Sequence, residues 1–179
     1  MTAPASRRLF IGLIPPDAVR DRLLEWRDRW QWPAGAARVP AAHLHLTLHF
    51  LGEVAEDRLP PIQAALARVP IDPFQLRLGT PGLWRHGLAV VCPDPDARLD
   101  ALRESTGAAL AQAGGAGDEP TSLPWRAHVT LARRAPGARS PEGAELDLSW
   151  PVEGFALVWS RLPPQVPQPR YEVLSRWPA

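Results

Sequence analysis

Two short stretches, residues 44–48 and 127–131, alternate strictly between apolar and polar side chains. Each reads apolar-His-apolar-Thr-apolar, and such alternation predicts a half-buried β-strand. Side chains two positions apart in a strand point to the same face, so His45 shares a face with Thr47, and His128 shares one with Thr130. The copies lie in the two halves of the 179-residue chain, which predicts one site built from two similar strands.

The rest of the chain alternates between apolar runs bounded by turn residues, which predict strands, and apolar positions three and four apart, which predict helices. The expected strands are 9–14, 43–51, 74–78, 83–92, 125–132, 152–160 and 171–177. The expected helices are 17–30, 57–69 and 95–113. The expected loops are a turn at 80–82, a mobile loop at 114–117 and an exposed loop at 135–145.

This order of elements predicts an α+β fold, because several strands follow one another without a helix and therefore need antiparallel pairing. We expect two pseudo-symmetric lobes, each an antiparallel-rich sheet with outer helices, and an active-site cleft between them. A chain of 179 residues fits one compact domain with a sizeable core. Residues 1–179 are therefore predicted to form a single bilobal domain.

The amino-acid composition excludes several classes of function. The hydrophobic fraction of 45%, the charged fraction of 22% and the net charge of +1 are typical of a globular protein without strong non-specific affinity for nucleic acid. All 20 basic residues are Arg, because the sequence contains no Lys. A Lys nucleophile, a Schiff base and a P-loop Lys are therefore excluded. Arginine instead favours forked contacts to phosphate or carboxylate groups.

The single cysteine excludes an intramolecular disulfide and a Cys-cluster zinc site. Cys92 ends the apolar run 88–92, so we expect a packed strand thiol. The apolar run 9–14 is too short for a signal-peptide core, and no stretch approaches transmembrane length. We expect a cytoplasmic monomer that contacts no membrane and needs neither a metal nor another cofactor.

Two facing histidines suit proton transfer near neutral pH, because an imidazole pKa of about 6.5 allows one ring to be neutral and the other charged. One ring can take a proton from the attacking nucleophile while the other gives a proton to the leaving oxygen. Thr47 and Thr130 can donate hydrogen bonds to non-bridging oxygens between the rings. Arg126 and Arg133 flank the second copy and can balance phosphoryl charge. This combination suits a phosphodiester.

The first copy alone does not identify the working histidine, because His43, His45 and His49 alternate along the same predicted strand. Only His45 has Thr two positions later and Leu three positions later, as His128 does. We expect His43 and His49 at the cleft rim or on the surface. His86 is expected in a turn.

The two arginines differ in their expected direction. Arg126 precedes His128 by two positions, so a regular strand places both on one face. Arg133 follows by an odd number of positions and reaches that face only if the strand ends or bulges by about Ala132. For Trp125, which could stack on a base, the core is the expected place.

The doubled motif resembles the 2H phosphoesterase superfamily, and the similarity spans nearly the whole chain. The matching segments are 8–13 (RLFIGL), 43–53 (HLHLTLHFLGE), 125–133 (WRAHVTLAR) and 170–174 (RYEVL). They are similar to the bacterial RNA 2′,3′-cyclic phosphodiesterases once called 2′-5′ RNA ligases. The resemblance implies a bilobal pseudo-symmetric fold and metal-independent hydrolysis of 2′,3′-cyclic phosphate ends, on RNA or a nucleotide, to 2′-phosphates.

The resemblance also implies roles for individual residues. His45 matches the proton donor and His128 the proton acceptor, while Thr47 and Thr130 match the motif threonines. Arg133 matches an arginine expected at the phosphate, so we predict Arg133 as the phosphate ligand and place Arg126 nearer the nucleoside or the cleft wall. The chain departs from the family pattern at Ala127, often Pro, and at His43, often a small polar residue.

Two alternatives stay open at this point. The same site could join RNA ends through a 2′-5′ bond in an ATP-independent, reversible reaction, although ligation through a Lys-adenylate is excluded by the absence of Lys. The chain could also be a non-catalytic RNA- or metal-binding module, with His43 and His45 holding a metal from one strand. Activity in excess chelator separates these alternatives.

Overall fold

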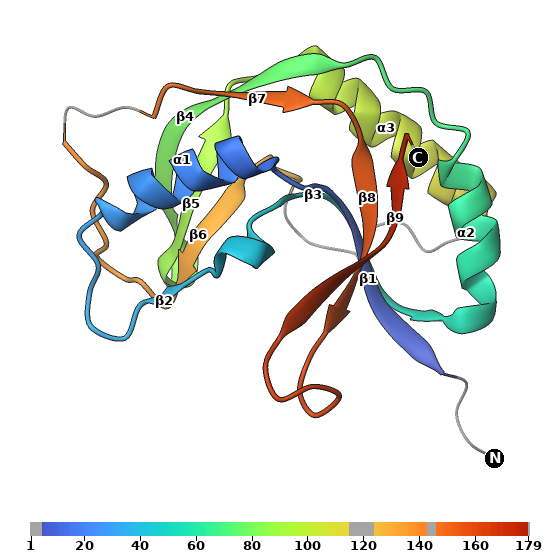
Figure 1. Cartoon of the computed structure of the whole chain (residues 1–179), viewed down its shortest axis with the longest axis horizontal. Coiled ribbons are helices and arrows are strands. Elements are labelled where there is room, and N and C mark those ends of the chain that lie inside the picture. The colour runs from blue at the N-terminus through green and yellow to red at the C-terminus, as the bar shows by residue number, and fades with distance from the viewer. Residues whose placement is uncertain (1–4, 115–123, 143–145, 179) are drawn as a thin grey trace.

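The computed structural model describes residues 5–114, 124–142 and 146–178, whose strands form one curled antiparallel sheet (Figure 1). The strands are β1 (Ser6–Leu13), β2 (Ala37–Arg38), β3 (Leu46–Ala55), β4 (Phe74–Trp84), β5 (Leu88–Pro93), β6 (Val129–Arg133), β7 (Leu148–Val152), β8 (Phe155–Arg161) and β9 (Arg170–Trp177). The helices are α1 (Asp17–Asp28), α2 (Leu59–Leu66) and α3 (Ala97–Gln112). The predicted α+β class with antiparallel pairing is confirmed. None of the described helices is both long and apolar enough to cross a membrane.

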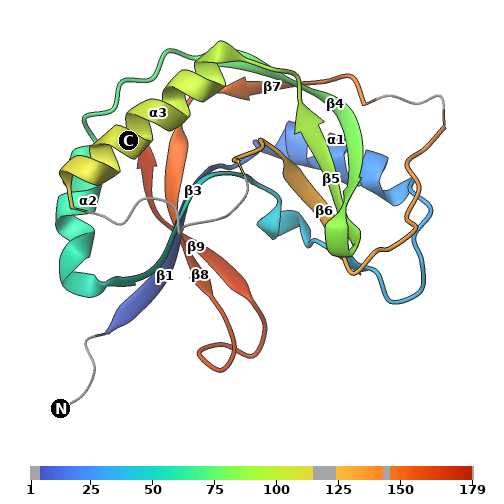
Figure 2. The ribbon, with the colours of Figure 1, turned by 180° about the vertical axis from the view of Figure 1, so that it is seen from behind.

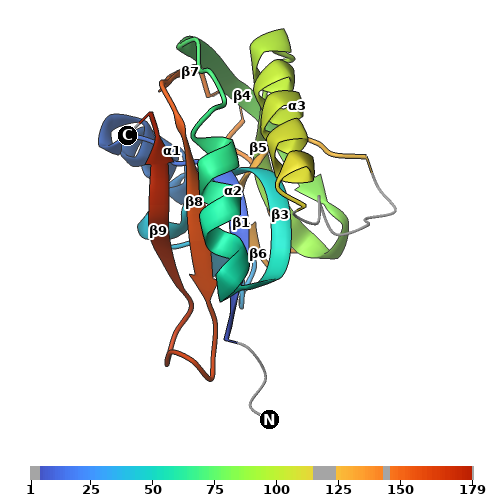
Figure 3. The same ribbon diagram turned by 90° about the vertical axis from the view of Figure 1, so that its right-hand side faces the viewer.

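The strand order is β7-β4-β5-β6-β3-β1-β8-β9, with the short β2 paired to β6. The middle of this order is the antiparallel β3–β6 pair, in which Leu46 lies opposite Val129. The two expected sheets are thus two halves of one continuous sheet. Helix α1 contacts β7, in the half of the sheet that also holds β4, β5 and β6, whereas α3 contacts β3 and Gln63 of α2 donates a hydrogen bond to Ser175 of β9, in the other half (Figures 1 and 2). Helices α2 and α3 lie next to each other (Figure 3).

From Leu9 to Leu13, strand β1 is buried on both faces, as its continuous apolar run predicts. Leu9 and Ile11 belong to the main core, which includes residues from all three helices. Phe10 points the other way and packs with Ala156 and Val158 in a second, smaller cluster. The sheet therefore has one face covered by helices and one face without a helical cover near these residues.

The hairpin between β4 and β5 turns later than predicted. The turn expected at 80–82 is wrong, because β4 continues to Trp84 and the chain reverses at Arg85–Gly87. Strand β7 pairs with β4 only from Phe74 to Leu78. Pro81 therefore sits beyond the reach of β7, on an edge where its missing N–H costs no ladder hydrogen bond. The predicted turn position of His86 is confirmed by its φ of 62°.

The predicted strand 152–160 is two strands, β7 and β8, separated by Glu153 and Gly154. Gly154 is required here, because a Cβ would collide with the Trp177 carbonyl oxygen of β9. The two histidine strands start one residue after their histidines, at Leu46 and Val129. From position 115 the expected loop 114–117 lies outside the described residues, as do positions 143–145 of the loop 135–145.

Candidate active site

The two motif histidines lie next to the strand pair at the centre of the sheet order, each one residue before a paired residue. Because Leu46 lies opposite Val129 in an antiparallel pair, the register brings His45 beside Thr130 and Thr47 beside His128. These four side chains point to one face of the sheet, which we call the histidine face. It is the face that carries the smaller apolar cluster, since Phe10 of that cluster lies 4.6 Å from the His45 ring.

Both motifs contain the same irregularity directly after the threonine. Opposite β1, the pairing steps from Gly12↔Thr47 to Ile11↔His49 and leaves Leu48 as an extra residue. Opposite β5, it steps from Val90↔Thr130 to Ala89↔Ala132 and leaves Leu131 as an extra residue. A bulge of this kind reverses the direction of every later side chain relative to the earlier ones. The two halves therefore share a bulge as well as a motif.

The bulge in β6 turns Arg133 onto the histidine face. Without it, Arg133 would point away from His128, as the sequence indicated. Consistent with this reversal, Leu131 and Ala132 are both buried, whereas Arg133 is exposed. The strand thus has the irregularity that the assignment of Arg133 to the phosphate required.

The bulge in β3 has the opposite consequence for His49. Its predicted place at the rim or surface is wrong, because the side chain is only 4% exposed and lies against α3. Its Nε2 lies 2.8 Å from the Arg103 carbonyl oxygen and 3.0 Å from Thr106 Oγ1. Since a carbonyl oxygen can only accept, Nε2 donates. His49 therefore fastens β3 to α3 on the covered side of the sheet.

Each motif histidine is held by a hydrogen bond to a backbone carbonyl two residues earlier. His45 Nδ1 lies 2.7 Å from the His43 carbonyl oxygen, and His128 Nδ1 lies 2.8 Å from the Arg126 carbonyl oxygen. Because these carbonyls can only accept, both Nδ1 atoms carry the proton. Nε2 is consequently the atom of each ring that can gain or lose a proton.

Aromatic side chains surround the two rings. His45 lies between Phe10, at 4.6 Å, and Tyr171 of β9, at 5.3 Å between ring centroids. The His43 ring lies 4.4 Å from the Tyr171 ring, and His43 is half-buried, as expected of a rim residue. On the second half, the Trp84 ring lies 4.6 Å from the His128 ring. These rings restrict both imidazoles and remove water from around them.

The surroundings favour the neutral form of both histidines in the free protein, because they lower the pKa of each ring. Burial is the main reason that the pKa of His45 is lowered to about 4; the hydrogen bond to the His43 carbonyl oxygen opposes this shift, and positive charge on His128, Arg133 and His43 adds to it. Burial also lowers the pKa of His128, with further lowering by Arg133 and Arg126. Arg133 thus acts on both histidines, whereas Arg126 acts on His128. A bound phosphate anion would offset these charges and raise the pKa of both rings.

Tyr171 lies in the same electrostatic field. Burial raises the pKa of its phenol, while the charges of Arg133 and Arg8 oppose that rise. Arg8 also covers the Phe50 ring, at 4.5 Å from the ring centroid. Arginine charge therefore reaches the histidine face from both halves of the sheet.

Trp125 ties the approach to the second motif to the backbone of the first. Its indole Nε1 donates a hydrogen bond of 3.1 Å to the Thr47 carbonyl oxygen. The Arg103 guanidinium of α3 lies 4.8 Å from the Trp125 ring centroid, and Arg103 Nε donates to the carbonyl oxygen of the bulge residue Leu48 at 3.2 Å. Trp125 is half-buried against the main core, which agrees with its expected packing role.

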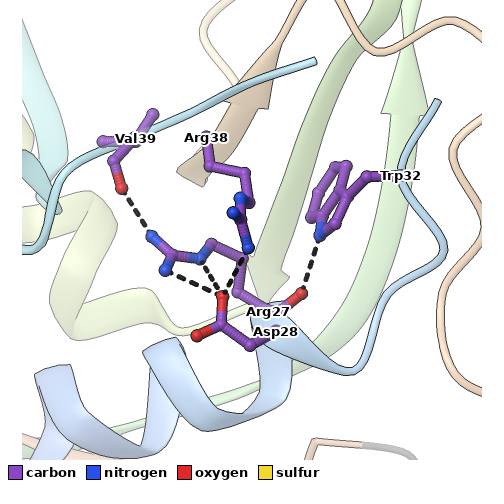
Figure 4. Close-up of polar contacts among 5 residues, drawn as sticks. All are labelled: Arg27, Asp28, Trp32, Arg38 and Val39. Carbon is purple, nitrogen blue, oxygen red and sulfur yellow. Dashed lines mark hydrogen bonds and ion pairs between the residues drawn. The ribbon is translucent and has the colours of Figure 1, made fainter. Parts of the chain in front are cut away.

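A second network of polar contacts holds β2, the strand that pairs with the Arg133 end of β6 (Figure 4). Arg27 at the end of α1 donates to the Val39 carbonyl oxygen at 2.6 Å and pairs with Asp28 at 2.8 Å. Arg38 of β2 reaches the same Asp28 carboxylate at 3.4 Å. Strand β2 then pairs directly with the Arg133 end of β6. Helix α1 is in this way coupled to the position of Arg133.

Sequence reasoning missed most of the supporting residues. Phe10 and Trp84 were placed only within the expected strands 9–14 and 83–92, and Arg8 was noted only as part of a matching segment. Tyr171 could have been found, because it is the only tyrosine in the chain and lies in another matching segment. Among the described residues, no group of three or more His, Cys, Asp or Glu side chains comes together as metal ligands would.

Comparison with known proteins places this geometry among phosphoesterases. The family described as LigT like Phosphoesterase matches residues 13–91, a span that includes His45 and ends before His128. An RNA 2′,3′-cyclic phosphodiesterase from Thermus thermophilus is 38% identical over 189 aligned positions, which cover 95% of this chain and 89% of the relative.

Solved structures show the same similarity. The crystal structure of Escherichia coli LigT in apo form aligns with a TM-score of 0.82 and 28% identity over 96% of both chains. The structure of Escherichia coli LigT complexed with 3′-AMP aligns with a TM-score of 0.80 and 27% identity, over 97% of this chain and 98% of that chain. The similarity therefore includes both histidine strands and the sheet that joins them.

Proposed function

This chain belongs to the LigT-like phosphoesterase family, and on that premise we propose that it hydrolyses the 2′,3′-cyclic phosphate ends of RNA to 2′-phosphates. The observation that supports this most directly is the pairing of Leu46 with Val129, which sets the two His-x-Thr motifs head to tail. That register brings two imidazoles and two hydroxyls to one face of the sheet, and the bulge in β6 directs Arg133 to the same face. A phosphodiester group matches that set of donors.

The proposed reaction is an in-line displacement at phosphorus. His128 Nε2 accepts a proton from a water molecule as the water oxygen bonds to phosphorus. The bond between phosphorus and O3′ breaks, and His45 Nε2 gives its proton to that oxygen. The products are a free 3′-hydroxyl and a 2′-phosphate, and both rings return to their starting state by exchanging a proton with solvent.

The remaining residues stabilise charge on the phosphoryl group. Thr47 and Thr130 donate to its two non-bridging oxygens, one from each half of the sheet. Arg133 offers a charge-assisted contact to the same oxygens. The pairing of β6 with β3 and β5 sets the backbone positions of these donors before the substrate arrives, and donors positioned in advance lower a reaction barrier.

Because the pKa of His45 is low in the free protein, the substrate must also bring about the protonation of this ring. A ring with a pKa of about 4 is neutral at pH 7 and cannot donate a proton. The anionic cyclic phosphate raises the pKa of His45 when it binds between the rings, and the ring then takes up the proton that it later gives to O3′. Binding of the correct anion therefore activates the proton donor.

Incubation with adenosine 2′,3′-cyclic phosphate in excess chelator tests the proposal. We expect adenosine 2′-phosphate as the product, identified by phosphorus NMR, and no product from a His45→Ala variant prepared in the same way. Loss of turnover in chelator, or a 3′-phosphate product, would contradict the proposed reaction. The monomeric state and the cytoplasmic location expected from the sequence stay predictions.

A further inference from the structure

Trp84 and Arg126 form a pair on the histidine face that the proposed chemistry does not use. The Arg126 guanidinium lies 4.7 Å from the centroid of the Trp84 ring, and that ring lies 4.6 Å from His128. Arg126 is exposed and Trp84 half-buried. Within the described part of the chain, the Arg126 guanidinium has this ring contact but no carboxylate partner.

The backbone holds Trp84 in this place. Gly82 lies two positions earlier on the same face, and a Cβ there would come within 3.0 Å of Trp84 Nε1. Gly82 lies opposite Val90, and Val90 lies opposite Thr130. The Trp84 indole therefore lies on the same face of neighbouring strands as the second motif. The lack of a side chain at Gly82 thus leaves the space that the Trp84 indole occupies beside the site.

The turn after Trp84 is also fixed. His86 and Gly87 both have positive φ values, of 62° and 68°. A Cβ on Gly87 would come within 2.6 Å of the Pro136 backbone nitrogen, and Ala135 N–H donates to the Gly87 carbonyl oxygen at 2.9 Å. The β4–β5 turn is therefore packed against the segment that follows β6, which limits movement of the indole.

A guanidinium lying on an indole presents a flat cationic outer face with N–H groups around its edge. The flat face can stack on a nucleobase, and the edge can contact a phosphate. An exposed arginine that has no carboxylate partner among the described residues, next to a histidine assigned to phosphate chemistry, is placed to receive such a group. A nucleoside 2′,3′-cyclic phosphate has one base and one phosphate. An RNA end has, in addition, the base of the preceding nucleotide and the phosphodiester that joins the two nucleotides.

We propose that Trp84 and Arg126 form a second nucleotide subsite, which binds the ribonucleotide adjacent to the one that carries the cyclic phosphate. Its base stacks on the Arg126 guanidinium above Trp84, and the guanidinium edge contacts the intervening phosphodiester. The proposal rests on the proposed function and adds a preference to it: the protein acts on RNA ends in preference to free cyclic mononucleotides.

The test compares two substrates, adenosine 2′,3′-cyclic phosphate and the dinucleotide ApA ending in the same cyclic phosphate. We expect kcat/KM to be about tenfold higher or more for the dinucleotide, in line with the usual contribution of one stacked base. Trp84→Ala and Arg126→Gln should bring the ratio of the two kcat/KM values close to one. Trp84→Phe, which keeps a ring, should retain most of it.

Leu83→Ala is the matched control, because Leu83 is 43% exposed on the adjacent position of the same strand and points to the other face. It should keep the wild-type ratio. A wild-type ratio near one, or an unchanged ratio in Trp84→Ala, would overturn the subsite. If the protein hydrolyses neither substrate, the proposed function fails. The Kd values of adenosine 2′-phosphate and of ApA 2′-phosphate, measured by calorimetry, then decide the subsite by the same ratio.

Discussion

Leu46 of β3 and Val129 of β6 lie directly opposite each other, and each of them follows a motif histidine by one residue. The two strands run in opposite directions, so this pair is the centre of an approximate two-fold relation between the motifs. The histidines therefore approach a group bound between them from opposite sides. An in-line displacement needs that arrangement, because the entering and leaving oxygens are on opposite sides of phosphorus.

The two arginines should differ in their effect on a mononucleotide substrate. Arg133 lies on the histidine face beyond the bulge and acts on both histidines, so Arg133→Ala should lower kcat/KM about ten- to a hundredfold, as expected for loss of a contact worth about 1.5–3 kcal/mol. Arg126→Ala should lose less on adenosine 2′,3′-cyclic phosphate. A larger loss in Arg126→Ala than in Arg133→Ala would reverse the assignment.

The pH dependence should differ between the free protein and its substrate complex. Burial and neighbouring cations lower the pKa of both histidines in the free protein. The bell-shaped profile of kcat/KM, which reports the free protein, should therefore have its optimum below the ordinary imidazole pKa of about 6.5. Bound phosphate raises both values, so the optimum of kcat should lie at higher pH. Coinciding optima, with chemistry rate-limiting, would count against this electrostatic scheme.

Alternation was sufficient to find the motifs but not the bulges. A bulge depends on how many residues the partner strand offers, and the partners here are Gly12 with Ile11 and Val90 with Ala89. Nothing in the sequence around Leu48 records that pairing. His49 was therefore placed on the wrong side of the sheet, and the direction of Arg133 was left conditional.

The turn before β5 shows a second limit of the sequence. Thr80, Pro81 and Gly82 have the composition of a turn, and local reasoning placed one there. The free edge that makes Pro81 acceptable within a strand is set by where β7 stops, and β7 comes from a distant part of the chain. Because the turn was misplaced, Trp84 could not be recognised as a neighbour of His128.

Trp125→Phe should weaken both the fold and the reaction, because it removes the N–H that binds the Thr47 carbonyl oxygen. We expect a loss of about 1 kcal/mol in the free energy of unfolding and a decrease in kcat on the cyclic mononucleotide. Trp159→Phe is the control. The Trp159 indole N–H is buried without a hydrogen-bond partner among the described residues, so this change should leave kcat unaltered. Equal kcat values in the two variants would argue against a positioning role for Trp125.

Gly107→Ala should destabilise the protein although Ala is the better helix former by about 1 kcal/mol. A Cβ at this position of α3 would lie 3.1 Å from His49 Cε1. The His49 ring is buried and bound to α3 itself, so it cannot retreat without losing its hydrogen bonds. Ser105→Ala, at an exposed position of the same helix, should instead raise the denaturation midpoint slightly. A higher denaturation midpoint in both variants would show that the His49 ring can move away from a Cβ at position 107 without cost.

The histidine pair itself is tested most directly by kcat/KM of His45→Ala, His128→Ala and the double variant on adenosine 2′,3′-cyclic phosphate. In each single variant, kcat/KM should fall about 10²–10⁴-fold, while a cooperative thermal unfolding transition should show that the variant is still folded. Two groups that act in one concerted step lose their effect together, so the double variant should be about as slow as the slower single variant. Losses that multiply in the double variant, or near-wild-type turnover in either single variant, would contradict the paired mechanism.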